Sequence, residues 1–223
     1  TLGFTLFQAR LDAAAAREPF ERSRELGAGE ATVLARFAQY CARTGRDADA
    51  TEAIRRALVL DKFNPLIHRA AASIEFAARR YAASIPPARE SLRMNPRLSR
   101  VHAAIGDALL LMGRLDEARK EYGLETARGF GLTGLAIVEH KLGRADAARQ
   151  ARDELVRSEG DRMLYQQAQV AAQWGEPEQA VVSLQRALII GDGGLVYARN
   201  DPFLDPLRSD PRFAQLLKRM GFA

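Results

Sequence analysis

The chain has 223 residues and a formal net charge of +5, from 33 Lys and Arg against 28 Asp and Glu. Its length allows one or two domains with a sizeable core. With 40 Ala, 10 Phe, 5 Tyr and a single Trp, it is rich in the strongest helix former and poor in the aromatic residues that favour strands. No run of 18 apolar residues is present. The composition therefore predicts helices and no membrane span in this sequence.

Cysteine and arginine usage exclude further classes. The single cysteine, Cys41, excludes an intramolecular disulfide and a Cys-cluster metal site. The 29 arginines are spread along the chain among Asp and Glu, with doublets only at Arg55-Arg56 and Arg79-Arg80. This pattern is typical of solvated helix surfaces and lacks the continuous basic stripe of a nucleic-acid interface. We therefore expect no direct nucleic-acid binding by this segment.

Apolar residues at spacings of three and four predict twelve helices before residue 191. Their expected ranges are 1–9, 13–26, 31–43, 47–60, 65–78, 82–94, 99–112, 116–127, 131–142, 145–158, 161–174 and 177–190. A glycine stands in the turn between paired helices at Gly45, Gly113, Gly143 and Gly175. A helix end there needs a residue that tolerates positive φ. Each unit is therefore a helix, a tight turn and a second helix.

Proline occurs inside two of the predicted second helices, at Pro19 and at the Pro86-Pro87 pair. A proline at such a place removes a helical hydrogen bond or moves the helix start onward. We expect a bend near the start of both helices.

The units recur with a period of 34 residues, which separates Asp61 from Asn95. When the inter-helix glycine is placed at position 15, positions 8 and 20 hold only small residues. They are Ala38, Ala72, Gly106, Ala136 and Ala168, and Ala50, Ser84, Ala118, Ala148 and Ala180. Small side chains at these places let the two helices of a unit approach closely where they cross.

The character of the chain changes after Gly191. Three Asp-Pro pairs follow, Asp201-Pro202, Asp205-Pro206 and Asp210-Pro211, and each Asp is expected to cap a helix that begins at its Pro. The last pair opens a helix through about Met220 with one apolar face, as expected of the terminal cap that a repeat array needs. We therefore divide the chain into a repeat solenoid, 1–192, and a C-terminal segment, 193–223.

These repeats resemble the tetratricopeptide repeat (TPR) family over about residues 4–192. The resemblance implies an all-α, right-handed α-solenoid of about six units, the first one incomplete, with a C-terminal capping helix. Two departures stand out: Arg79 occupies a position expected to be glycine, and the step from the fourth to the fifth unit, near Gly129 and Gly131, is only 30 residues.

The closing stretch from Asp201 to Phe213 carries a narrower resemblance. It is similar to the C-terminal TPR regions of bacterial winged-helix transcriptional regulators and of class III adenylate cyclases. Neither a winged helix nor a cyclase domain is present in this sequence. The chain also begins within amphipathic sequence, as expected of a segment of a longer protein.

The first helices of TPR units line a concave groove, and the resemblance implies which residues face it. In this chain they are Gln39, Arg43, Arg69, Ser73, Phe76, Arg100, Asp107, Lys141, Tyr165, Gln169 and Gln173. This polar set, with Phe76 and Tyr165 as anchors, suits an extended peptide or a partner helix. Ser73 and Asp107 stand where the family's chaperone-tail clamp has Asn, so we do not expect that clamp. The alternative is a groove that is only solvated.

No motif for catalysis, phosphate binding or calcium binding occurs. His68 and His102 are 34 residues apart because they share a repeat position, and His140 lies elsewhere in its unit. Without Cys or a convergent carboxylate they do not indicate a metal site. We expect no cofactor and a buried, unreactive Cys41. Trp174 fits either the core or the groove.

The sequence therefore predicts a non-enzymatic protein–protein interaction module that binds a peptide or protein segment in its groove, as part of a larger bacterial signalling or regulatory protein. The alternative is a sensor domain whose ligand binding or self-association controls an attached DNA-binding or cyclase domain. An RNA-binding repeat is disfavoured by the irregular spacing and the variable groove. The expected location is the cytoplasm, or the periplasm if a transmembrane segment lies upstream.

Overall fold

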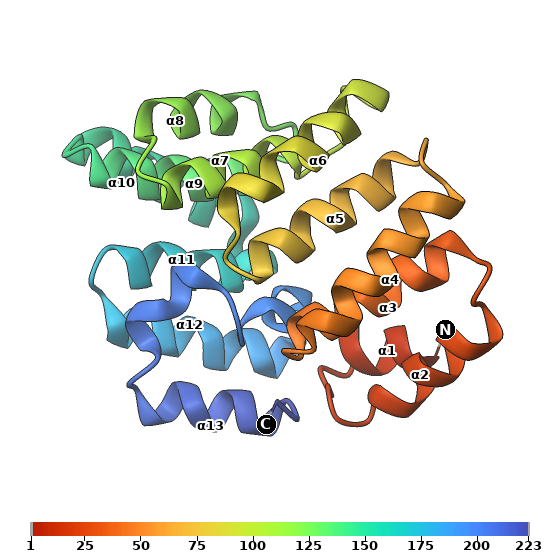
Figure 1. Cartoon of the computed structure of the whole chain (residues 1–223). Helices are drawn as coiled ribbons and strands as arrows, with labels where there is room; N and C mark the ends of the chain where they lie inside the picture. The colour runs from red at the N-terminus through yellow and green to blue at the C-terminus, as the bar shows by residue number, and fades with distance from the viewer. Residues whose placement is uncertain (1, 223) are drawn as a thin grey trace.

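The computed structural model describes residues 2–222, and within this range all regular elements are helices (Figure 1). Five helix pairs follow one another: α3 (Ala31–Arg43) with α4 (Asp47–Leu60), α5 (Pro65–Ala77) with α6 (Tyr81–Met94), α7 (Val101–Leu111) with α8 (Leu115–Leu124), α9 (Arg128–Lys141) with α10 (Ala145–Glu159), and α11 (Leu164–Gln173) with α12 (Pro177–Ile190). A shorter pair, α1 (Leu2–Gln8) and α2 (Arg17–Leu26), precedes them. The expected all-α, right-handed solenoid of paired helices is confirmed.

Short 3₁₀-helices complete the chain. One, η1 (Gly160–Met163), joins α10 to α11. Two more, η2 (Gly193–Tyr197) and η3 (Pro202–Leu207), lead to the final helix α13 (Pro211–Arg219).

Helix boundaries follow the sequence closely where caps and glycines mark them. Helices α3, α4 and α12 span the predicted residues. The start of the first predicted helix, residue 1, lies outside the described residues. Helix α2 begins at Arg17 rather than at residue 13, because Asp12 holds a turn in which its carboxylate accepts a hydrogen bond from the Ala15 amide at 2.9 Å.

The short step between the fourth and fifth units lies between α8 and α9. Only residues 125–127 join these helices, and α9 begins at Arg128 instead of residue 131. Three glycines are buried in α9, and they let it pack tightly against its neighbours. A Cβ on Gly134 would lie 2.1 Å from the ring of Tyr122. Close packing therefore keeps these glycines inside a helix despite their low helix propensity.

The prolines lie at different depths in the two helices. Pro19 is the third residue of α2, where a backbone amide has no intrahelical partner to lose. Pro86 and Pro87 lie inside α6, which begins before them at Tyr81. The Ser84 hydroxyl donates a hydrogen bond of 2.8 Å to the Tyr81 carbonyl in the first turn of this helix.

All ten positions predicted to be small are buried. Ala38, Ala50, Ala118 and Ala136 have no exposed surface. At Gly106, a Cβ would come within 2.6 Å of the Tyr122 ring. These contacts confirm that small residues allow the helices of each unit to cross closely.

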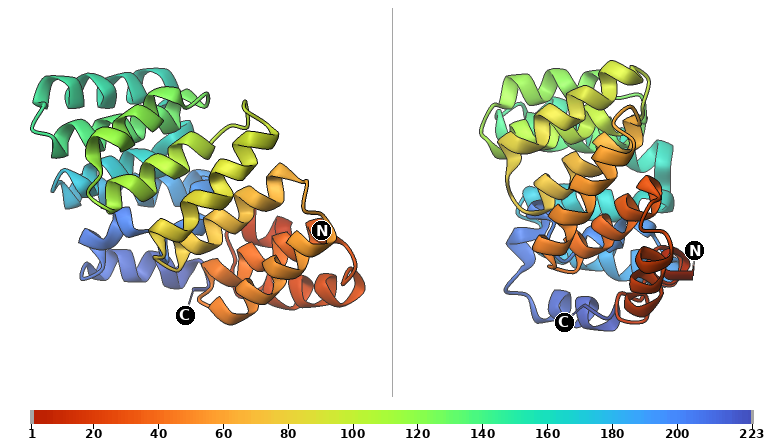
Figure 2. Two further views of the ribbon diagram at one scale, coloured as in Figure 1. Left: turned by 45° about the horizontal axis from the view of Figure 1, so that its top comes forward. Right: turned by 45° about the vertical axis from the view of Figure 1, so that its right-hand side comes forward.

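The C-terminal segment joins the two ends of the solenoid (Figures 1 and 2). Near α13, the Met220 carbonyl accepts a hydrogen bond of 2.9 Å from the Ala13 amide. The Phe222 ring meets the Phe7 ring edge-on at 6.2 Å between centroids. One continuous apolar core contains residues of the first units, of α11 and α12, and of this segment. The predicted cap of the last unit thus also packs against the first.

Two of the three Asp-Pro predictions are confirmed. The Asp201 carboxylate accepts from the Phe203 amide at 2.9 Å, and the Asp210 carboxylate accepts from the Arg212 amide at 2.8 Å. The prediction for Asp205 is wrong, because this residue lies inside η3 and caps no helix. Its carboxylate instead accepts hydrogen bonds from Arg79 and Arg208.

Among the described residues, no helix combines the length and the apolar character needed to cross a bilayer.

The close crossings predict a strong effect on stability. Ala148 is 1% exposed, whereas its neighbour Ala147 on the same helix is exposed. Ala148→Arg forces a large, charged side chain between two helices and should lower the free energy of unfolding by about 3 kcal/mol or more. Urea denaturation measures this. The same substitution at Ala147 is the control and should change the free energy by less than about 0.5 kcal/mol. Equal stability of the two variants would contradict the assigned crossing.

Candidate functional site

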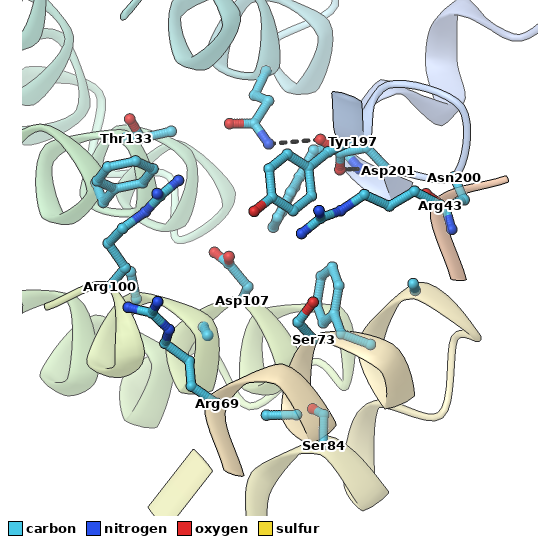
Figure 3. A pocket seen from close by; sticks show the side chains of 18 of the residues that line it. Arg43, Arg69, Ser73, Ser84, Arg100, Asp107, Thr133, Tyr197, Asn200 and Asp201 are labelled. Atoms are coloured by element: carbon cyan, nitrogen blue, oxygen red, sulfur yellow. Dashed lines mark hydrogen bonds between the residues drawn. The ribbon is translucent and has the colours of Figure 1, made fainter. Parts of the chain in front are cut away.

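A cavity lies on the concave side of the superhelix, between the first helices and the C-terminal segment (Figure 3). Helices α3, α5, α7, α9 and α11 contribute lining residues, and η2 and η3 cover the opposite side. The space open to the centres of water molecules is about 210 Å³. The wall combines apolar side chains with arginines and two carboxyl groups.

Most residues expected in the groove line this cavity. They are Gln39, Arg43, Arg69, Ser73, Phe76, Arg100, Asp107, Tyr165 and Gln169. Lys141, at the end of α9, is exposed and does not line it. Gln173 lies outside the cavity and contacts the C-terminal segment. Whether these residues bind a partner stays a prediction.

The C-terminal segment occupies the part of the groove formed by α11. The hydroxyl of Tyr165 and the amide of Gln169, the latter at 2.7 Å, both donate to the Asp201 carboxylate. Gln173 donates to the Phe203 carbonyl at 2.8 Å. Tyr165 is only 2% exposed. The expected anchor at Tyr165 is therefore engaged by the chain itself in this conformation.

The same segment is held from the opposite side by Arg79. Its guanidinium forms two hydrogen bonds to the Asp205 carboxylate, at 2.6 and 2.7 Å. Arg79 adopts φ +60°, the left-handed conformation that glycine takes at the other inter-helix turns. A residue other than glycine pays a conformational penalty there. The departure from the glycine pattern therefore places an arginine where it can bind the returning chain.

Arg43 and Tyr197 form one wall of the cavity. Arg43 is 5% exposed, and its guanidinium lies 4.0 Å from the centroid of the Tyr197 ring. The positive charges of Arg43, Arg100 and Arg69 lower the pKa of the Tyr197 hydroxyl against the opposing effect of burial, Arg43 contributing most. Three guanidinium groups thus act on one hydroxyl.

Arg69 and Arg100 lie across the cavity from this wall, and Asp107 lies between the two arginines and the wall (Figure 3). The Arg100 guanidinium lies 4.2 Å from the centroid of the Phe130 ring. Burial, and then the positive charge of Arg100, lower the pKa of Arg69. Among the described residues, neither arginine has a carboxylate within ion-pair distance, and the same holds for Arg43.

Two carboxyl groups accompany the arginines. Asp107 accepts a hydrogen bond of 2.8 Å from the Tyr122 hydroxyl. Desolvation in the cavity wall raises the pKa of Asp107 to about 7. Burial also raises the pKa of Asp201, against the lowering effect of its hydrogen bonds. Asp201 is already bound by side chains and by the Phe203 amide, so Asp107 is the carboxyl group with capacity for another partner.

His102, His140, Trp174 and Cys41 make packing or hydrogen-bond contacts within the fold. His102 pairs with Glu121 at 2.8 Å, and His140 stacks on the Trp174 ring at 5.0 Å. Trp174 lies between units, where its indole donates to the Ala136 carbonyl at 3.1 Å. Burial raises the pKa of Cys41 to about 12. In the part of the chain that the structure describes, no cluster of His, Cys, Asp and Glu could hold a metal ion.

Several residues of the cavity were not among those expected. Phe130 and Thr133 come from α9, and Tyr197, Asn200 and Phe203 come from the C-terminal segment. The repeat pattern ends before this segment, so it gives no position for its residues. The Asp-Pro pairs indicated local caps but not the place of the segment in the fold.

Comparison with known proteins supports the fold. No family model and no curated protein matches the sequence. Among solved structures, Pseudomonas aeruginosa PilF aligns with a TM-score of 0.60 and 21% identity over 88% of this chain and 91% of PilF. YrrB, a TPR protein described as having an unusual peptide-binding site, aligns with a TM-score of 0.50 and 13% identity over 89% of this chain and 97% of YrrB. At these identities the likeness shows that the chain has the fold of TPR proteins.

The environment of Asp107 predicts a pH-dependent stability. Its pKa is raised from 3.8 to about 7 by burial and by the nearby Asp201 and Glu125, against the lowering effect of Tyr122. The unfolded chain therefore releases this proton at lower pH than the folded chain, so the group lowers the free energy of unfolding as pH rises from about 4 to about 7.

Asp107→Asn keeps an acceptor for Tyr122 and cannot ionise. The difference in free energy of unfolding, variant minus parent, should increase by up to about 4 kcal/mol between about pH 4 and pH 7 and stay constant at higher pH. Urea denaturation at several pH values measures the difference, with the exposed Asp153→Asn as control. A difference for Asp107→Asn that does not change with pH would contradict the raised pKa.

Proposed function

We propose that this chain is a non-enzymatic protein–protein interaction module whose concave groove binds a peptide or protein segment. The fold it shares with PilF and YrrB supports an interaction module. The resemblance of its closing segment to bacterial regulators supports a place in a larger signalling or regulatory protein.

One observation carries the proposal: the groove already holds a polypeptide, residues 199–207 of its own chain. Gln173 binds a backbone carbonyl of this segment, and Asn200 of the segment donates to the Ala42 carbonyl of α3 at 2.9 Å. Arg79 binds its Asp205 carboxylate. Side chains of the concave face thus satisfy both the backbone and the acidic groups of a bound segment, which is what recognition of an extended peptide requires.

The part of the groove on α5 and α7 is left for a partner. Phe76, Arg69 and Arg100 line the cavity there and are not engaged by carboxylates of the described residues. Aromatic and arginine side chains contribute most of the binding energy at typical interfaces. We therefore place the partner against this half of the groove.

A second function, that of a sensor, is favoured by the enclosure of the same space. The C-terminal segment converts the open groove into a cavity lined from opposite sides. A ligand in this cavity contacts both the repeats and the segment, so its binding can change how the segment is held. An attached domain can be controlled in this way.

Capture of partners with this chain as bait, followed by calorimetry on the captured protein, tests the interaction module. Phe76→Ala and Arg69→Ala should each weaken binding by about 2 kcal/mol or more. Arg89→Ala, an exposed arginine of α6 that does not line the cavity, is the matched control and should bind like the parent. Equal affinity of all variants would contradict binding in the groove.

A further inference from the structure

The arginines of the cavity differ from those of the helix surfaces. Many surface arginines pair with acids one turn away, as in Arg55 with Glu52 at 2.9 Å and Arg93 with Glu90 at 2.7 Å, whereas others are exposed to water and unpaired among the described residues. Arg43, Arg69 and Arg100 line one cavity and have no carboxylate within ion-pair distance among residues 2–222. Arg43 is buried and Arg69 is half-buried, so two of these charges are partly withdrawn from water, while Arg100 is exposed beside them at the cavity. Positive charge withdrawn from water without a counter-charge is costly, and an anion in the cavity would compensate it.

The backbone at Arg100 is a second, independent indication. Arg100 adopts φ +70°, one of only three non-glycine residues with positive φ among those described. Its amide is fixed by a hydrogen bond of 2.8 Å to the Glu125 carboxylate, and its guanidinium by the Phe130 ring. Strained backbone of this kind is concentrated at binding sites, where the surrounding structure holds it. Arg100 lines the cavity together with Arg69, and the two lie close enough for the charge of Arg100 to lower the pKa of Arg69.

We propose that this cavity is a binding site for a small organic anion. Arg69 and Arg100 receive its phosphoryl or carboxylate group, because paired guanidinium groups bind such oxyanions with charge-assisted hydrogen bonds. The body of the ligand extends past Asp107 towards Tyr197 and Arg43, against Ile137 and Phe203 of the cavity wall.

The size and charge of the space agree with such a ligand. The cavity offers about 210 Å³, whereas a cavity of about 150 Å³ is enough to hold benzene. Asp107, at its centre, is partly protonated near neutral pH and can then donate a hydrogen bond to the ligand. Three guanidinium groups against two carboxyl groups, one of them partly neutral, leave the cavity positively charged.

This proposal rests on the sensor function proposed above and names the class of its ligand. It does not depend on whether a protein partner binds, which only the test of the interaction module measures.

Isothermal titration calorimetry with phenyl phosphate and with benzoate tests the site. The compound that binds with the higher affinity identifies the preferred acidic group. Benzyl alcohol, a neutral compound of similar shape, should not bind, and inorganic phosphate should bind more weakly than phenyl phosphate. Arg69→Gln and Arg100→Gln should each lower the affinity for the preferred anion about tenfold or more. Both residues are less buried than Arg43, so these variants should fold like the parent. Arg89→Gln is the matched control and should bind like the parent.

No binding of either anion at millimolar concentration, or equal affinity of the cavity variants and Arg89→Gln, would overturn the anion site. Hydrogen exchange of residues 193–207 with and without the anion separates the sensor function from the site. Slower exchange of these amides in the bound state supports both the anion site and the sensor function. Binding without any change in exchange supports the site and contradicts the sensor function.

Discussion

The return of residues 193–222 across the concave face is the constraint on which the rest of the structure depends. An open array of helix pairs leaves an apolar surface at each end, and each unit contacts only its neighbours. Here the returning segment covers the last unit with α13 and reaches the first through the Ala13–Met220 hydrogen bond and the Phe7–Phe222 contact. The two ends of the array therefore share one core, and their stabilities are coupled.

The same return determines what the concave face can bind. The segment engages the side chains of α11 and contacts α3 through Tyr197 and Asn200, and it leaves the side chains of α5 and α7 around a cavity. Arg79 links the repeats to the returning segment, because it lies in the turn between α5 and α6 and binds Asp205 of the segment. A ligand in this cavity would contact the element that closes the fold, because Tyr197, Asn200 and Phe203 of that element line it. Binding and closure can influence each other for this reason.

Local features of the fold could be predicted from the sequence, and its closure could not. The small residues at Ala38 and Ala118 and the bounds of α3 and α12 follow from periodicity, caps and glycines, which act within a few residues. Asn200 and Ala42, by contrast, are 158 residues apart in the sequence, and no short-range pattern relates them. The repeat positions place Tyr165 in the groove, and it lines the cavity, but the carboxylate that binds its hydroxyl belongs to the segment beyond the repeats.

Nuclear Overhauser effects between aromatic rings test the closure most directly. With phenylalanine selectively labelled, the account predicts cross-peaks between the ring protons of Phe7 and Phe222, whose centroids lie 6.2 Å apart. It also predicts cross-peaks from the Tyr197 ring to the side chain of Arg43, whose guanidinium carbon lies 4.0 Å from the ring centroid. A folded chain with resolved signals for these residues and neither set of cross-peaks would contradict the account.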